Sequence, residues 1–410
     1  MSAPAGAQVR IVRLAAGGDG VGRLADGRTV FVPRTAPGDL VRLRDVRPAK
    51  RFARARIDRV LEPGPDRAPP PCPHYVRDEC GGCQLQHLTL AAQLEARRGF
   101  VGDALRRLAR LDLPDPPIEP APAPLAYRAK LTLAARHRRI GLHPYGRPDL
   151  VFDLERCYIA AGPLQQLWTA ARGLRDLLPS NLAQLVLRLD RAGGKHLVAR
   201  VHGTHVWTSA GELARRLADV GAPATLWWEP EGGSARVLAG AAVAGPHVAV
   251  FEQVHPAMGD RVRDFAIAQL GEVAYRRVWD LYAGIGETTA RLAAAGAEVE
   301  SVELDRRAVA YSEAGPPARR HAGRVEELLP RLPDPELVIT NPPRIGMEAR
   351  AIAELARRSP ARIVYVSCDP ATLARDIVRL GPRYRPGTVR CFDLFPQTAH
   401  VETVAVLERQ

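Results

Sequence analysis

The chain has 410 residues, 46% of them hydrophobic, and carries a formal net charge of +13 at pH 7. A chain of this length typically forms two or three globular domains. It contains no run of about 18 apolar residues, which argues against a membrane-spanning helix. Residues 1–6 lack the basic and apolar stretches of a secretory signal, so we expect a cytoplasmic protein that does not meet a membrane.

The positive charge favours a polyanionic partner, of which nucleic acid is the commonest. Lys50, Lys130 and Lys195 are the only lysines, so arginine carries nearly all of the charge, and codon usage in a GC-rich genome is an alternative explanation. The distribution of charge helps to decide. Residues 1–70 hold 14 Arg or Lys against 7 Asp or Glu, a net charge of +7, so we expect this segment to bind nucleic acid.

Short apolar runs begin the chain and predict strands at 9–14, 29–32, 40–46 and 53–61. Turns rich in Gly and Asp separate these runs, a spacing typical of a small β-barrel. Arginines alternate along the strands, with Phe31 and Phe52 among them, which suits an RNA-binding surface.

Cysteines mark the next segment, which follows a proline-rich break at 62–71. Four of the six could act together as thiolate ligands: Cys72, Cys80, Cys83 and, 74 residues after Cys83, Cys157. In a cytoplasmic protein of this size a metal-binding or catalytic role is more typical than a disulfide framework. Four thiolates bind either zinc or an iron–sulfur cluster, and the spacing alone does not separate the two.

The rest of the chain predicts two further α/β units. Residues 88–111 have helical periodicity, and residues 125–255 alternate strand-like runs with a helix near 162–178. After a linker at 114–124 and this mixed region, apolar runs predict buried parallel strands at 278–282, 298–303, 337–340 and 363–367. Strands that alternate with glycine-bearing turns and helices predict a doubly wound sheet.

A glycine-bearing loop follows the first of these strands. Gly284 and Gly286 allow a tight turn close to a ligand, and Glu303 ends the next strand, where its carboxylate can accept both hydroxyls of a ribose. A dinucleotide fingerprint needs a third glycine, and Thr289 stands in that position. The loop therefore suits S-adenosylmethionine, which has no pyrophosphate, better than a dinucleotide; a purely structural turn is the remaining alternative.

Three polar segments at 340–346, 366–373 and 395–403 also lie at strand ends, where ligands bind in a parallel sheet. Their sequences, NPPRIG, VSCDPATLARD and FPQTAHVE, resemble motifs of the RNA uracil-5 methyltransferase family, and residues 251–255 resemble its F-x-Q-x-N segment. The chain is most similar to members with an N-terminal TRAM domain and an iron–sulfur cluster. The resemblance covers nearly the whole chain.

The resemblance implies an α/β protein of three parts. Residues 1–62 would form a TRAM- or OB-like RNA-binding barrel, and 63–255 a mixed α/β central domain with the iron–sulfur site. Residues 256–410 would form a Rossmann-like class I methyltransferase domain, on which the helix at 88–111 could pack. It also implies a [4Fe–4S] cluster held by Cys72, Cys80, Cys83 and Cys157.

The implied reaction explains the residue types. Uracil C5 is too weak a nucleophile to take a methyl group directly, so a thiolate, here Cys368, adds at C6 and activates C5. Glu402 would then remove the C5 proton after methyl transfer from S-adenosylmethionine. Cys391 lies in no motif and is expected in the core. The resemblance places seven residues at the cofactor: Gln253, Tyr282, Gly284, Gly286, Glu287, Glu303 and Asn341.

The sequence departs from the family pattern at four points. Asn341 stands where the family has Asp, and Asp369 and Glu287 each stand where the family has Asn. The gap between Cys72 and Cys80 is two residues longer than is usual in the family. An Asn amide can match the edge of uracil or of cytosine, so an RNA cytosine-5 methyltransferase is one alternative. A non-catalytic RNA-binding assembly factor is another. We expect a monomer acting on 23S ribosomal RNA, with transfer RNA as the alternative substrate.

Overall fold

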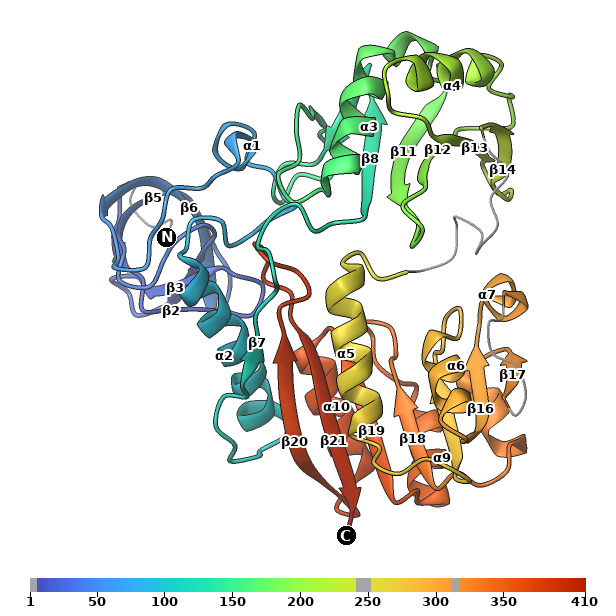
Figure 1. Cartoon of the computed structure of the whole chain (residues 1–410). Coiled ribbons are helices and arrows are strands. Elements are labelled where there is room, and N and C mark those ends of the chain that lie inside the picture. The colour runs from blue at the N-terminus through green and yellow to red at the C-terminus, as the bar shows by residue number, and fades with distance from the viewer. Residues whose placement is uncertain (1–5, 241–251, 312–317) are drawn as a thin grey trace.

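The computed structural model describes residues 6–240, 252–311 and 318–410, which form three sheets with their helices (Figure 1). The first sheet has the order β1-β5-β6-β4-β3-β2. Its end strands β1 and β2 are separated by two residues of chain, so the sheet curls around a small apolar core. The strands are β1 (Gln8–Arg10), β2 (Arg13–Leu14), β3 (Gly20–Arg23), β4 (Thr29–Val32), β5 (Leu40–Pro48) and β6 (Phe52–Glu62).

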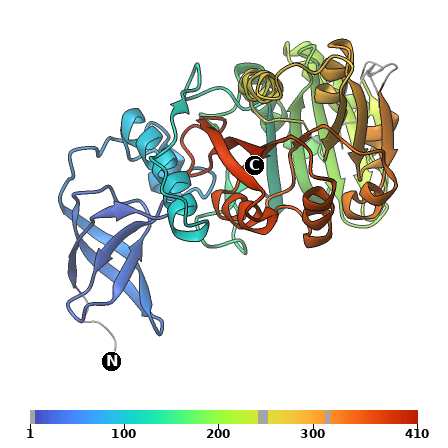
Figure 2. The same cartoon turned by 90° about the horizontal axis from the view of Figure 1, so that it is seen from below.

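Two helices follow this sheet, α1 (Pro73–Arg77) and α2 (Leu90–Leu108). The hydroxyl of Thr89 caps α2 by accepting from the amide of Ala92 at 3.3 Å. Val101 and Leu105 of α2 are buried in the same apolar core as the C-terminal sheet. Figure 2 shows α2 between the N-terminal sheet and the red strands of the C-terminal sheet.

The central sheet has the order β10-β9-β8-β11-β12-β13-β14, and its main core lies on the face covered by α3 and α4. Alternate residues of its strands supply this core, as a sheet with one covered face requires. The elements are β8 (Lys130–Arg136), β9 (Arg139–Leu142), β10 (Phe152–Asp153), α3 (Gly162–Gly173), η1 (Arg175–Leu177), β11 (Leu182–Leu189), β12 (Lys195–Val201), α4 (Ala210–Asp219), β13 (Thr225–Pro230) and β14 (Arg236–Ala239).

The C-terminal sheet has the order β17-β16-β15-β18-β19-β21-β20-β7, and β21 is antiparallel to both of its neighbours. Separate apolar cores lie on its two faces, which is the layering of a doubly wound sheet. Its strands are β7 (Ile118–Glu119), β15 (Arg277–Leu281), β16 (Glu298–Glu303), β17 (Arg319–Ala322), β18 (Leu337–Thr340), β19 (Arg362–Ser367), β20 (Tyr384–Phe392) and β21 (Glu402–Arg409).

Helices alternate with these strands along the chain. They are α5 (Pro256–Ala268), α6 (Glu287–Ala294), α7 (Arg306–Ala310), α8 (Val325–Leu328), η2 (Leu329–Arg331), α9 (Ala349–Arg358) and α10 (Pro370–Leu380). Among the described residues, no helix has the length and apolar character needed to span a membrane.

The predicted mixed α/β fold is confirmed, with differences in detail. The strand predicted at 9–14 is two strands, β1 and β2, and β3, β7, β17, β20 and β21 were not predicted. The long strands β20 and β21 were missed because the prediction relied on strands that alternate with helices, as in a parallel sheet. β20 and β21 instead pair antiparallel with no helix between them. Phe251, the first residue of the F-x-Q-x-N segment, lies outside the described residues.

Candidate active site

The glycine-bearing loop joins β15 to α6 at the carboxyl edge of the sheet. Tyr282, Gly284 and Gly286 all have positive φ angles, of 61°, 57° and 89°, which turn the chain sharply into α6. Glu303 ends the neighbouring parallel strand β16, and its carboxylate accepts from the amides of Gly284 at 2.9 Å and Asp305 at 2.8 Å. The structure therefore brings these predicted cofactor residues together.

Arg320 of β17 forms hydrogen bonds to this loop. It was not identified from the sequence as a site residue. Its guanidinium donates to the carbonyls of Gly284, Ile285 and Ala308, the last two at 3.0 Å. A Cβ at Gly286 would lie 2.9 Å from Nη1 of Arg320, so only glycine fits there without a shift. The sequence carried no signal for Arg320 because β17 itself was not predicted.

A buried carboxyl group explains the threonine at the third glycine position of the loop. Thr289 donates its hydroxyl proton to Asp280 at 2.6 Å, and neither side chain reaches solvent to any extent. Burial raises the pKa of Asp280 to about 6, against the lowering effect of this hydrogen bond. Thr289 therefore fixes the start of α6 to the end of β15.

Cys368, the predicted nucleophile, directly follows β19 and is half-buried. Burial raises the pKa of its thiol, and the nearby carboxyl of Glu402 raises it further. The guanidinium of Arg344 opposes both effects and forms a hydrogen bond to the thiol. Asp369 caps α10 by accepting from the amide of Thr372 at 2.8 Å, a role that the family's Asn could also fill.

Glu402, the predicted base, opens β21 and is 2% exposed. β19 and β21 pair antiparallel as far as Ser367 opposite Thr403, so Cys368 and Glu402 each lie one residue beyond the last pair, at the same edge of the sheet. Burial raises the pKa of Glu402 to about 8, and Arg344 acts to lower it. The thiol, the carboxyl and the guanidinium thus form one electrostatic group at the sheet edge.

His400 adds a fourth side chain to this group. Its Nε2 lies 3.5 Å from Nη2 of Arg344. Burial lowers the pKa of His400 to about 4, and Arg344 contributes in the same direction. The imidazole is therefore neutral near pH 7. Arg344 and His400 stand in the motifs quoted above, yet the sequence did not single them out.

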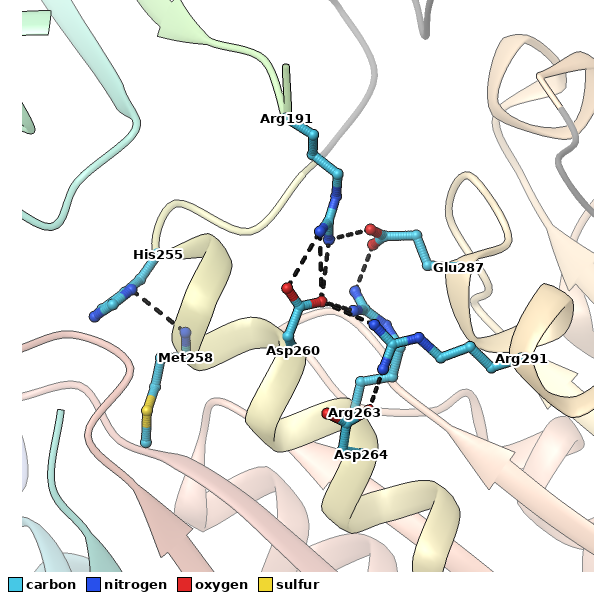
Figure 3. A network of polar contacts seen from close by, with 8 residues as sticks. All are labelled: Arg191, His255, Met258, Asp260, Arg263, Asp264, Glu287 and Arg291. Carbon is cyan, nitrogen blue, oxygen red and sulfur yellow. Dashed lines mark hydrogen bonds and ion pairs between the residues drawn. The ribbon is translucent and has the colours of Figure 1, made fainter. Parts of the chain in front are cut away.

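The remaining predicted cofactor residues lie around this edge in different settings. Asn341 follows β18 and is exposed at the sheet edge. Gln253 lies just before α5 and lines a small cavity with Pro256 and residues 188–191 of the central sheet. Glu287 begins α6, but its carboxylate pairs with Arg191 and Arg263 (Figure 3).

These pairs belong to a network of charges between the central sheet and α5 and α6, which we call the Arg191 network (Figure 3). Asp260 of α5 lies 3.2 Å from Arg191, 2.6 Å from Arg263 and 3.1 Å from Arg291. Arg191 comes from the turn between β11 and β12, so it joins the central sheet to the helix that follows the glycine loop. The members are Arg191, Asp260, Arg263, Glu287 and Arg291.

The four cysteines predicted as ligands, Cys72, Cys80, Cys83 and Cys157, all line one cavity of about 150 Å³. Burial raises the pKa of Cys80 to about 11, and the neighbouring thiols of Cys157 and Cys72 add to the shift. The amide of Gly82 lies 3.4 Å from the sulfur of Cys80. In the described ranges, no group of three or more His, Cys, Asp or Glu side chains is arranged to hold a single metal ion.

Comparison with known proteins identifies the family. The family model described as tRNA (uracil-5-)-methyltransferase matches residues 311–410. An uncharacterized RNA methyltransferase of Thermosynechococcus vestitus is 32% identical, covering 98% of this chain and 97% of its own length. The 23S rRNA (uracil(1939)-C(5))-methyltransferase RlmD of Chromohalobacter salexigens is also 32% identical, covering 97% and 88%.

A solved structure shares the fold over nearly the whole chain. It is the tRNA (uracil-54, C5)-methyltransferase of Pyrococcus abyssi in complex with S-adenosyl-L-homocysteine, with a TM-score of 0.73 and 21% identity over 97% of this chain and 99% of that one. The glycine loop, the motifs at the sheet edge and the full-length relatives all indicate the same family. The chain belongs to the RNA uracil-5 methyltransferase family and is an S-adenosylmethionine-dependent RNA (uracil-C5) methyltransferase.

Proposed function

We propose that Cys368 is the nucleophile and Glu402 the base of this methyl transfer, and that the target uridine lies in 23S ribosomal RNA. One observation supports the assignment of roles: Cys368 and Glu402 each lie one residue beyond the last pair of β19 and β21, where their charges interact and Arg344 acts on both. A thiol and a carboxyl on facing sides of one edge can reach C6 and C5 of the same pyrimidine ring.

The thiolate of Cys368 adds to C6 of uracil, and the electron pair of the C5–C6 double bond moves toward C5 and the O4 carbonyl. C5 then attacks the sulfonium methyl group of S-adenosylmethionine, and S-adenosylhomocysteine leaves with the electrons of the broken C–S bond. Glu402 takes the proton from C5. The electrons of that C–H bond restore the double bond and expel the thiolate.

The charges around these two groups fit these steps. Arg344 stabilises the thiolate of Cys368, although burial and Glu402 still keep the pKa of this thiol above its ordinary value. Burial of Glu402 strengthens it as a base, because a carboxylate with a pKa of about 8 binds a proton more tightly than an exposed one. His400 is neutral at pH 7, so it adds no positive charge that would repel the guanidinium of Arg344.

S-adenosylmethionine would be held at the glycine loop. Gly284 and Gly286 let the main chain approach it, and the free lone pairs of Glu303 would accept the ribose hydroxyls. Tyr282 would pack near S-adenosylmethionine. Asn341 and Gln253 would lie beside the methyl group of S-adenosylmethionine and the target base. Glu287 would act at the cofactor through the start of α6, because its carboxylate is engaged by Arg191 and Arg263.

The proposed 23S ribosomal substrate is supported by the function named for the Chromohalobacter relative and by the basic N-terminal sheet. The family model and the Pyrococcus structure carry tRNA in their names, so transfer RNA is the second candidate. Methyl-labelled S-adenosylmethionine with transcripts of both RNAs separates the two. We expect labelled 5-methyluridine in the 23S fragment; label in transfer RNA alone would contradict the proposal.

A [4Fe–4S] cluster is proposed for Cys72, Cys80, Cys83 and Cys157. A zinc ion with four thiolates at about 2.3 Å needs sulfurs roughly 3.8 Å apart, whereas these thiols stand around a cavity. The Gln86 side chain and amides near Cys157 point at the sulfurs, as donors do around a cluster. Anoxically purified protein should be brown, with about four iron atoms per chain. Stoichiometric zinc without iron would contradict this proposal.

We also propose the division of labour implied by the family. Residues 1–62 would bind RNA, 63–255 would carry the cluster, and 256–410 would catalyse methyl transfer in a monomer. Deleting residues 1–62 should weaken RNA binding and reduce its dependence on salt, because phosphate contacts release counterions. The same affinity and salt slope as the full chain would contradict it.

A direct test of the nucleophile compares two cysteines. Cys368→Ala should abolish 5-methyluridine formation, whereas Cys391→Ala, which changes a thiol buried in the core of the same sheet, should keep it. Folding of both variants is checked by thermal unfolding. Methyl transfer by folded Cys368→Ala at the parent rate would exclude the proposed role.

A further inference from the structure

Residues 395–401 belong to the loop between β20 and β21, lead directly into Glu402 and include His400; we call them the catalytic loop. Three consecutive carbonyls of this loop accept hydrogen bonds from residues far away in the sequence. Pro396 accepts from the hydroxyl of Tyr127 at 3.0 Å, and Thr398 accepts from the guanidinium of Arg97 at 3.1 Å. Between them, Gln397 accepts from the amide of Gln84 at 3.2 Å and that of Leu85 at 3.0 Å.

Gln397 has a left-handed backbone, with φ of 70°, although it is not a glycine, and it is 3% exposed. Such a conformation persists only where surrounding contacts enforce it. Gln93 of α2 supplies them in a reciprocal pair. Its Nε2 donates to Oε1 of Gln397 at 3.0 Å, and its Oε1 accepts from the Gln397 amide at 3.2 Å.

Gln84 ties the same loop to the cysteines. Its Oε1 accepts from the amide of Ala399 at 3.3 Å, while its Nε2 donates to the carbonyl of Gly81 at 2.8 Å. Gly81 stands between Cys80 and Cys83, so one side chain spans from the cysteine turn to the residue before His400. We call residues 84–127, which provide all of these partners, the supporting segment.

Cys368 is positioned by different elements. It lies between β19 and α10, whose start is capped by Asp369 within the C-terminal sheet itself. The two reacting groups therefore differ in the hydrogen bonds that support them: the cap of α10 lies next to Cys368, and the supporting segment bonds to the chain that leads into Glu402. The supporting segment touches the Cys368 side through apolar packing of α2 against α10.

We propose that Gln93 and Gln84 are positioning residues for proton removal, acting through the catalytic loop on Glu402. This inference rests on the proposed role of Glu402 as the base. Loosening the loop should leave thiolate addition and methylation largely intact but slow the removal of the C5 proton. A methylated covalent protein–RNA adduct should then accumulate.

The test uses Gln93→Met in the full-length protein as purified. The change keeps the side-chain volume but removes both hydrogen bonds to Gln397, together with the one that Gln93 donates to the Leu88 carbonyl. Gln93 lies away from the four cysteines, so metal loading should match the parent, and iron content is measured to verify this. Glu95→Ala, at an exposed position of the same helix, is the matched control. Gln84→Ala provides a second route to the same loop should Gln93→Met unfold.

We expect turnover to fall by about ten- to a hundredfold, part of the ~10²–10⁴-fold contribution of a positioned base. The adduct, labelled from the methyl group of S-adenosylmethionine, should rise on denaturing gels, while the single-turnover rate of its formation changes by less than about threefold. A parallel fall in adduct formation and turnover, or turnover at the parent rate, would overturn the inference. Glu402→Gln is run alongside: if it also traps nothing, the role of Glu402 has failed instead.

Discussion

Among the described residues, two of the contacts between the C-terminal sheet and the rest of the chain are opposite in character. At the catalytic loop, neutral amides and carbonyls bond in the interior, where Gln93 and Gln397 are 1% and 3% exposed. At the Arg191 network the contact consists of ion pairs near solvent, where the side chains of Arg191 and Asp260 are 44% and 32% exposed (Figure 3).

The two contacts therefore differ in what they can determine. The first can fix the position of a loop, and the second can stabilise the contact between two parts of the chain. Buried hydrogen bonds are directional, and water and salt do not screen them, so they can fix a loop that delivers a base. Exposed ion pairs are screened and contribute about 0–1 kcal/mol each. The Arg191 network can therefore stabilise the contact of the central sheet with α5 and α6, but it does not set the positions of reacting atoms.

The largest effect is expected at Arg97, which is 1% exposed and lies 3.2 Å from the carboxylate of Asp393. Arg97→Met would leave this buried carboxyl without its cation and Thr398 without a donor, at a cost of about 3–5 kcal/mol in unfolding free energy. Urea unfolding measures the loss, with Arg107→Met, at an exposed position of the same helix, as the control. Equal losses for the two variants would contradict the buried contact.

The pH dependence of that loss has a definite sign. Burial raises the pKa of Asp393, and Arg97 lowers it. Without Arg97 the folded-state pKa rises further above the unfolded value, so the folded variant binds the extra proton. Its stability relative to the parent should therefore fall as the pH rises through that range.

For the group formed by Cys368, Glu402 and Arg344, we expect turnover to depend on pH rather than on salt concentration. The proposed base Glu402 must be ionised to accept a proton, and its pKa is raised to about 8, so turnover should increase as the pH rises through this value. Arg344→Met removes the cation that lowers the pKa of both Glu402 and Cys368, and it should move the midpoint to higher pH. Arg350→Met is an exposed control; an unchanged midpoint in Arg344→Met would exclude this electrostatic role.

The supporting segment also predicts a link between the cysteines and the catalytic loop. In Cys157→Ala, iron content should drop and amides of residues 395–401 should exchange hydrogen roughly tenfold faster, because Gln84 joins the cysteine turn to Ala399. The β11–β12 turn, which carries Arg191, should exchange at the parent rate. Faster exchange at both contacts would mean general loosening and would remove the distinction between them.

The smallest effect is expected at Arg191. Arg191→Ala removes its pairs with Asp260 and Glu287 and should raise KM for S-adenosylmethionine by about two- to fivefold with kcat unchanged. At roughly 1 M salt, where the Debye length is about 3 Å, the difference should largely disappear. Arg216→Ala, an exposed ion-paired residue of α4, is the control. A large, salt-independent fall in kcat would contradict the comparison.

The sequence predicted what local patterns encode. Apolar runs located β15, β16, β18 and β19, and motifs at their ends located Gly284, Cys368 and Glu402. It could not predict contacts between distant segments: Gln93 and Gln397 are 304 residues apart, and neither has a recognisable pattern around it. Arg320 was missed with its strand, and the pairing of Glu287 with Arg191 depends on how two sheets face each other.

The account rests on two groups that act at separate steps, and one measurement tests it most directly. Glu402→Gln and Cys368→Ala are each incubated with RNA and methyl-labelled S-adenosylmethionine and then run on a denaturing gel. Glu402→Gln should accumulate a labelled covalent adduct, because addition and methylation proceed while C5 keeps its proton, and Cys368→Ala should form none. Turnover of Glu402→Gln at the parent rate without an adduct, or an adduct in Cys368→Ala, would contradict the account.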